Sequence, residues 1–119
     1  FAVLCFAVPI AAHGAWHWSA QTPTDRQALP PRLVHALRTK VPHGAVVLAP
    51  LGVSYRVVAD APLYVVGLPV THVADTRAND PYGRAKAVEH WLKTRDPRVA
   101  ARYGATWAIL DGRLYRLPR

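Results

Sequence analysis

The run Ala45-Val46-Val47-Leu48-Ala49 is apolar throughout and is bounded by Gly44 and Pro50. A short, continuous apolar run between Gly and Pro is typical of a strand buried on both faces, as in a parallel sheet. A second such run, Leu63-Tyr64-Val65-Val66-Gly67, follows residues 53–60, which can make about two helical turns. The order strand, helix, strand predicts a right-handed parallel crossover and therefore an α/β fold.

A longer helix is expected just upstream of the first strand. Pro30-Pro31 suits the first turn of a helix, and Pro42 ends the pattern. Between Pro31 and Pro42, apolar residues repeat at helical spacing at Leu33, Val34, Leu37 and Val41.

In the helix predicted over 53–60, we expect Tyr55 and either Val58 or Ala59 to face the core.

Two further helices are expected downstream. Asp80-Pro81 and Asp96-Pro97 each join an N-capping Asp to a Pro at the first helical position. The first of these helices should run to about Thr94, and its buried side should include Ala85, Val88, either His90 or Trp91, and Leu92. The second should end at Gly104, which suits a left-handed C-terminal position.

A third apolar run, Thr106-Trp107-Ala108-Ile109-Leu110, predicts a third strand. Asp111-Gly112 favours a two-residue hairpin turn, so Arg113 to Leu117 should return as an antiparallel strand. The arginines in that strand suit an edge, because charge discourages pairing with another chain. We therefore expect a small three-layer α/β domain with a mostly parallel sheet of three strands plus an antiparallel edge strand.

The N-terminal run Phe1 to Ala12 carries no charge and leads to Trp16 and Trp18. As a helix it covers ~18 Å, which is short of the ~30 Å hydrocarbon core of a bilayer. Tryptophan favours the membrane-water interface, and the chain starts at Phe1 without any Met. We therefore expect residues 1–18 to be the end of a transmembrane helix that belongs to a longer, multi-pass protein.

Two other interpretations of the apolar run remain open. It could be the core of a signal peptide, with Ala11 to Ala15 as a poor cleavage region, or a buried helix of a soluble domain. In the membrane interpretation, residues 19–30 form a linker and 31–119 form the soluble domain. No Lys or Arg lies between Ala12 and Thr24, which places the domain on the outer face of the cell membrane.

The chain is strongly basic, with 15 Lys and Arg against 7 Asp and Glu and a net charge of +8. Such a charge suits nucleic acid, anionic lipid or phosphorylated ligands. The basic residues are spread from Arg26 to Arg119 without a cluster or a nucleic-acid-binding motif, so a nucleic-acid partner is not expected. Hydrophobic residues make up 51% of the chain, which predicts a packed core rather than disorder.

The segment 68–80 is the candidate binding loop, because ligands of open parallel sheets lie beyond the carboxyl ends of the strands. His72, Asp75, Arg77 and Asn79 are its candidate substrate-binding residues, and Thr71, Thr76 and Asp80 lie beside them. A titratable His, a carboxylate and an Arg could bind a sugar or a phosphate. The alternative is a long turn whose polar side chains bond their own backbone and cap a helix.

Other patterns support no catalytic residue, metal site or cofactor. His13 and His17 are four residues apart but lack a third ligand nearby, and Cys5 is the only cysteine. Ser54 lies in no nucleophile motif, and the remaining histidines, His35, His43 and His90, form no recognisable nucleophile-base pair with it. The two familiar glycine-rich nucleotide-binding motifs are absent. Trp91 and Trp107 are expected in the core.

Several stretches carry a resemblance to a known family: Val46 to Pro50, Ser54-Tyr55-Arg56, His72 to Tyr82, and Arg102 to Leu110. After a final membrane helix and a linker, they resemble the C-terminal soluble tail of multi-spanning bacterial membrane proteins related to GT-C glycosyltransferases. That family transfers sugars from polyprenyl-phosphate donors at the outer face of the membrane. The resemblance implies catalytic carboxylates in an early outer loop, which this chain does not contain, so no catalytic residue is carried over.

Two functions of different class follow from these observations. The first is the outer domain of a membrane glycosyltransferase (a hexosyl- or pentosyltransferase), with membrane lipid and a polyprenyl-phosphate sugar or a glycan acceptor as partners. The second is a non-catalytic module, membrane-anchored or secreted, that binds an anionic ligand through a basic face.

Overall fold

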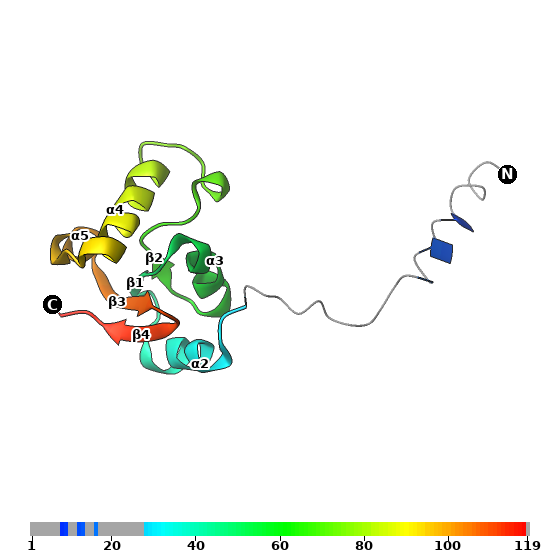
Figure 1. Ribbon diagram of the computed structural model, residues 1–119, viewed down its shortest axis with the longest axis horizontal. Helices are drawn as coiled ribbons and strands as arrows, with labels where there is room; N and C mark the ends of the chain where they lie inside the picture. Colours follow the sequence, from blue (N-terminus) through cyan, green and yellow to red (C-terminus); the bar gives the residue numbers. More distant parts are fainter. Residues whose placement is uncertain (1–7, 10–11, 14–15, 17–27, 119) are drawn as a thin grey trace.

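The structure is a computed structural model that describes residues 8–9, 12–13, 16 and 28–118 (Figure 1). The predicted membrane helix over 1–18 and the linker over 19–30 lie mostly outside these residues. Within the described part of the chain, no helix combines the length and apolar character that a membrane crossing requires. The elements, in order, are α2 (Pro31–Lys40), β1 (Val46–Leu48), α3 (Leu51–Asp60), β2 (Tyr64–Val65), the 3-10 helix η1 (Val70–His72), α4 (Pro81–Thr94), α5 (Pro97–Tyr103), β3 (Ala105–Leu110) and β4 (Arg113–Arg116).

The four strands form one sheet in the order β2-β1-β3-β4. Strand β1 is parallel to both β2 and β3, and β4 is antiparallel to β3. This confirms the predicted α/β fold with three parallel strands and an antiparallel edge strand. Asp111 and Gly112 both have positive φ angles, as the predicted Asp-Gly hairpin requires.

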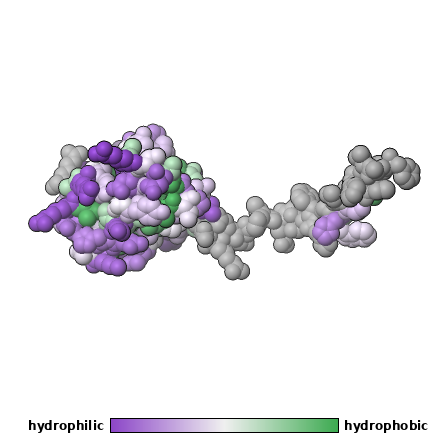
Figure 2. Space-filling model, turned by 90° about the horizontal axis from the view of Figure 1, so that it is seen from above, coloured by the Kyte–Doolittle hydropathy of each residue, from purple (hydrophilic) through white to green (hydrophobic). Residues whose placement is uncertain are grey.

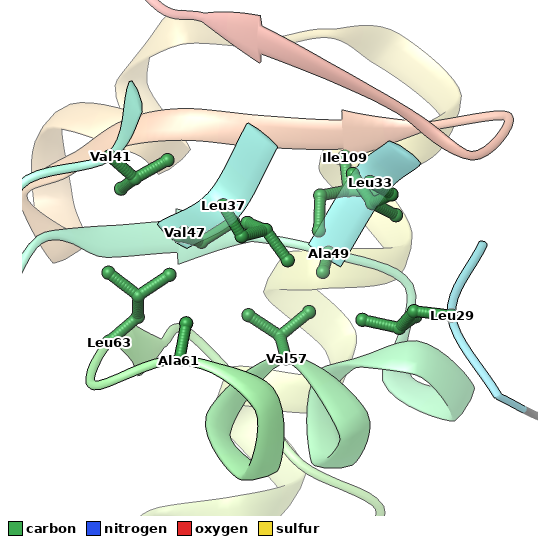
Figure 3. Packing of buried hydrophobic residues seen from close by; sticks show 10 residues of the cluster. All are labelled: Leu29, Leu33, Leu37, Val41, Val47, Ala49, Val57, Ala61, Leu63 and Ile109. Carbon is green, nitrogen blue, oxygen red and sulfur yellow. The ribbon is translucent and has the colours of Figure 1, made fainter. Parts of the chain in front are cut away.

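The sheet has a hydrophobic core on each face, because successive strand residues point to opposite sides. Val47 of β1 and Ala49, just after the strand, face α2 and α3, where the first cluster forms around Leu37 and Val57 (Figure 3). Leu48 faces α4 and α5, where the second cluster includes Val88 and Trp91. Figure 1 shows α2 on one side of the sheet and α4 and α5 on the other, which is the predicted three-layer arrangement.

A β-bulge in β3 changes which residues face each layer. Val46 of β1 pairs with Ala105, but its neighbour Val47 pairs with Trp107, so Thr106 is the extra residue. Ala105 therefore packs on the α4 and α5 side, and Trp107 packs against the cluster on the α2 side. The Trp107 ring is only half-buried, whereas Trp91 is 3% exposed.

Helices α4 and α5 begin where the Asp-Pro pairs predicted. The Asp80 carboxylate accepts a hydrogen bond from the Gly83 N–H at 3.2 Å, and the Asp96 carboxylate accepts one from the Arg98 N–H at 2.9 Å. Each cap satisfies an N–H that the helix leaves free at its first turn. Helix α5 ends at Gly104 in the left-handed conformation, as predicted.

The buried face of α3 differs from the prediction. Helix α3 starts at Leu51, two residues earlier than expected, and buries Ser54 and Val57. Tyr55 and Val58 are 52% and 37% exposed, and Ala59 is also exposed, so the predicted orientation was wrong. The helix packs against both the sheet and α2. Because apolar residues occur on all its sides, helical spacing alone does not identify the side that is buried.

The packed core also reaches beyond two predicted boundaries. Leu29 falls in the segment predicted as a linker, yet it is only 5% exposed and packs in the first cluster. Strand β2 has two paired residues, although Leu63 and Val66 at its ends are buried as expected for a strand.

Candidate functional site

The predicted binding loop, residues 68–80, connects β2 to α4 beyond the carboxyl end of β2 (Figure 1). Its first part forms η1, and His72, Asp75, Arg77 and Asn79 are all exposed. The loop lies on the upper side in Figure 1, and the view from that side shows a surface that is mostly hydrophilic with small hydrophobic patches (Figure 2). The four candidate residues are therefore accessible to a ligand.

Two of the four side chains have contacts within the domain. The Asn79 amide donates a hydrogen bond to the Ala74 carbonyl at 3.1 Å, which closes the loop on itself. The His72 ring lies 5.9 Å from the Tyr55 ring, measured between centroids, at an angle of 31°. Within the described residues, no hydrogen bond or ion pair joins the four candidates to one another. Asp75 and Arg77 thus have charged groups available for a ligand.

Arg84 of α4 ties this loop to the sheet, and the sequence did not single it out. Its Nε donates to the Asn79 carbonyl at 2.8 Å, and its Nη1 donates to the Val66 carbonyl at 3.3 Å. Its guanidinium also lies 5.3 Å from the centroid of the Tyr103 ring. Arg84 therefore joins α4, β2 and the loop at one point, beside a small hollow of about 130 Å³.

We expect Arg84→Gln to loosen the loop, because the shorter side chain cannot reach both carbonyls. Loss of these charge-assisted hydrogen bonds should lower the free energy of unfolding by about 1–2 kcal/mol. Amide hydrogen exchange of residues 74–80 should accelerate in the variant. Lys86→Gln, at an exposed position on the same helix, is the matched control. Unchanged exchange in Arg84→Gln would show that other contacts hold the loop.

Other predicted candidates are not brought together. Ser54 is fully buried, and its hydroxyl donates to the carbonyls of Ala49 and Pro50 at 3.3 and 3.2 Å. The side chain therefore has a structural role at the start of α3, where it provides hydrogen bonds to backbone carbonyls. His17 and Cys5 lie outside the described residues. Among those the structure describes, no group of three or more His, Cys, Asp or Glu side chains could hold a metal ion.

A groove between α2 and the β3–β4 hairpin is a second candidate site. It consists of two hollows of about 350 and 170 Å³ that share Lys40 and Trp107. Leu114 and the half-buried Trp107 pack against the first core cluster and line the wider hollow. We call this the α2–hairpin groove and define it by Arg32, Ala36, Lys40, Trp107, Leu114 and Arg116.

The positions of these residues follow from local structure. Arg32, Ala36 and Lys40 are four residues apart along α2, so they lie on one side of the helix. Arg116 is the cross-strand partner of Trp107, and its guanidinium lies 6.0 Å from the centroid of the Trp107 ring. Both patterns were present in the sequence, but their meeting depends on the packing of α2 against β4.

The charged side chains that line the α2–hairpin groove are all basic. Among the described residues, no Asp or Glu lines either hollow, and no ion pair involves Arg32, Lys40 or Arg116. Arg38, on the same helix, instead donates to the Asp60 carbonyl at 2.7 Å and lies 3.9 Å from its carboxylate. Asp60, which contacts α2 through Arg38, is therefore used outside the groove.

A larger, apolar groove lies on the other side of the hairpin. It has a volume of about 550 Å³ between α5 and the strands β3 and β4. Small residues of α5 and β3 leave this space open, and Trp91 and Leu117 lie at its sides. The small lining residues are Ala100, Ala101, Gly104, Ala105 and Ala108.

Comparisons of the chain with protein-family models, with curated proteins and with solved structures find no match. A function for the domain is therefore inferred from its own residues, namely the exposed loop 68–80 and the α2–hairpin groove.

Proposed function

We propose that the chain is the C-terminal extracytoplasmic domain of a membrane glycosyltransferase-like protein that transfers a sugar from a polyprenyl-phosphate donor. The catalytic groups lie outside these residues. One observation carries the proposal: the apolar run Phe1 to Ala12, which leads to Trp16 and Trp18, precedes a basic α/β domain. A loop of this domain exposes Asp75 and Arg77 beyond a parallel strand.

The two free side chains of the loop have complementary roles in this proposal. The Arg77 guanidinium donates paired hydrogen bonds to a phosphate or carboxylate, and the Asp75 carboxylate accepts hydrogen bonds from sugar hydroxyls. Arg84 and Asn79 act on the loop backbone and position these groups. The tail thus contributes acceptor binding, and it contributes no acid, base or nucleophile.

In the full-length membrane protein, we expect Asp75→Ala and Arg77→Ala each to reduce transfer about 5- to 10-fold, mainly through a higher KM for the acceptor. The loss corresponds to one exposed, charge-assisted contact. Initial rates at varied acceptor concentration give this split, and circular dichroism confirms folding. Lys93→Ala, an exposed charge on α4, is the control. Unchanged transfer in both loop variants would remove the loop from the proposal.

The second candidate is a non-catalytic module, membrane-anchored or secreted, that binds an anionic ligand. The α2–hairpin groove favours it, because Arg32, Lys40 and Arg113 line its wider hollow and no acidic residue in the described part of the chain does. A transfer reaction by the full-length protein distinguishes the two candidates, since a binding module catalyses none.

A further inference from the structure

We propose that the α2–hairpin groove binds the phosphate group of an organic phosphate ester, with the organic part of the ester against the Trp107 ring. The proposal rests on the second candidate function, the binding of an anionic ligand, and gives that ligand a place and a chemical class. It does not depend on transferase activity.

The number of cations around the groove favours a phosphate. Arg32 and Lys40 of α2 line the wider hollow together with Arg113 of β4. Lys40 also lines the narrower hollow, together with Arg116. A phosphate monoester carries a charge of about −1.5 to −2 and three acceptor oxygens, whereas a carboxylate carries one charge and two oxygens. Several cations held apart by two elements therefore match a phosphate better. The planar guanidinium of arginine also matches phosphate oxygens in pairs.

The cations repel one another when the groove is empty. Among the described residues, the groove holds no carboxylate that could offset this repulsion. An anion of roughly double charge placed between them removes the repulsion and adds attraction. The charge of Arg38, on a different side of α2, is offset by the Asp60 carboxylate, but the cations of the groove have no such acidic partner among the described residues.

The Trp107 ring provides a firm apolar surface next to these charges. Its backbone pairs with both β1 and β4, which holds the main chain at this position in the middle of the sheet. One part of the side chain packs against the core, while the rest lines both hollows. Such a ring can contact the carbon skeleton of a glycerol, sugar or prenyl group. The wider hollow, about 350 Å³, suits one small ligand.

The test compares two double variants of the full chain that remove the same charge. Lys40→Gln/Arg116→Gln acts in the groove, and Lys86→Gln/Lys93→Gln acts on α4, at the opposite face of the sheet; all four positions are exposed. Isothermal titration with glycerol 3-phosphate should show binding to the unaltered chain. We expect the groove variant to lose at least about tenfold in affinity and the α4 variant to lose less than about twofold.

Further probes identify the source of the phosphate and the role of the ring. Glycerol without phosphate should not bind. Binding of soluble glycerol 3-phosphate supports a free ester, whereas groove-dependent binding only to phosphatidic acid vesicles, and not to phosphatidylcholine vesicles, supports a lipid headgroup. The Trp fluorescence change on binding should disappear in Trp107→Phe, which keeps a ring in the core.

Three results would overturn the proposal. The first is no binding of either phosphate source by the unaltered chain. The second is equal weakening in the groove and α4 variants, which would indicate attraction to net charge alone. The third is binding of a short single-stranded oligonucleotide or of a sugar carboxylate without binding of glycerol 3-phosphate or phosphatidic acid. None of these results depends on sugar transfer, so they leave the glycosyltransferase proposal to its own test.

Discussion

Leu37→Ala is expected to lower the free energy of unfolding by about 2–5 kcal/mol. Leu37 is fully buried in the middle of α2 and packs between Val47 of β1 and Val57 of α3 (Figure 3). The substitution removes buried carbon atoms and leaves a cavity that helix and sheet cannot both close. A folded segment of this size has a total stability of only about 5–14 kcal/mol. The loss should therefore be a large share of the total.

Thermal unfolding followed by circular dichroism measures this effect. At ~4–8 °C per kcal/mol for a small domain, the Tm of Leu37→Ala should fall by about 10 °C or more. Val58→Ala, on the exposed side of α3, should change the stability by less than about 0.5 kcal/mol. If the two variants lost similar stability, α2 would not form the layer seen in the structure.

Trp91→Ala should produce a comparable loss on the opposite face of the sheet, about 3–5 kcal/mol. The Trp91 side chain is 3% exposed and packs with Leu48 and Val88 in the second cluster. The Arg95 guanidinium lies 5.0 Å from the centroid of its ring, so a cation–π contact is lost as well. Among the described residues, the other aromatic side chain at this cluster is Tyr103, which is only partly buried.

Urea unfolding at constant pH measures this loss. Tyr82→Ala, an exposed residue of the same helix, serves as the control and should cost less than about 0.5 kcal/mol. A Trp91→Ala chain with the stability of the control would contradict the packing of α4 on the sheet. An unchanged m-value in both variants would show that the comparison concerns the same cooperative unit.

The elements of the fold were predictable because their signals are local. Continuous apolar runs marked β1 and β3, Asp-Pro pairs marked the starts of α4 and α5, and Asp111-Gly112 marked the hairpin. Each of these signals depends on backbone sterics or on a cap within a few residues. Buried side chains on α2 and α4 followed from helical spacing in the same way.

The parts that escaped prediction depend on contacts between distant segments. The orientation of α3 is decided by its packing on the sheet and on α2, which placed Tyr55 outside and Ser54 inside. The role of Arg84 depends on the path of the loop above it. The α2–hairpin groove needs Lys40 and Arg116, which are far apart in sequence, and no local pattern reveals their proximity.

Strand β3 carries one residue more than β1 over the paired stretch, at Thr106. Ala105 and Trp107, which are two residues apart, therefore face opposite layers, whereas such residues face the same layer in a regular strand. Loss of the Thr106 codon would leave Ala105 and Trp107 opposite their present β1 partners and facing the same layers as now. Loss of a codon between Trp107 and Leu110 would instead exchange the inside and outside positions of the residues on one side of the deletion. Gain or loss of a codon at the hairpin tip, after Gly112, is far milder. Viable length changes among homologues of this chain should therefore collect at the tip, in the loop 68–80 and at Thr106, and should spare Trp107 to Leu110.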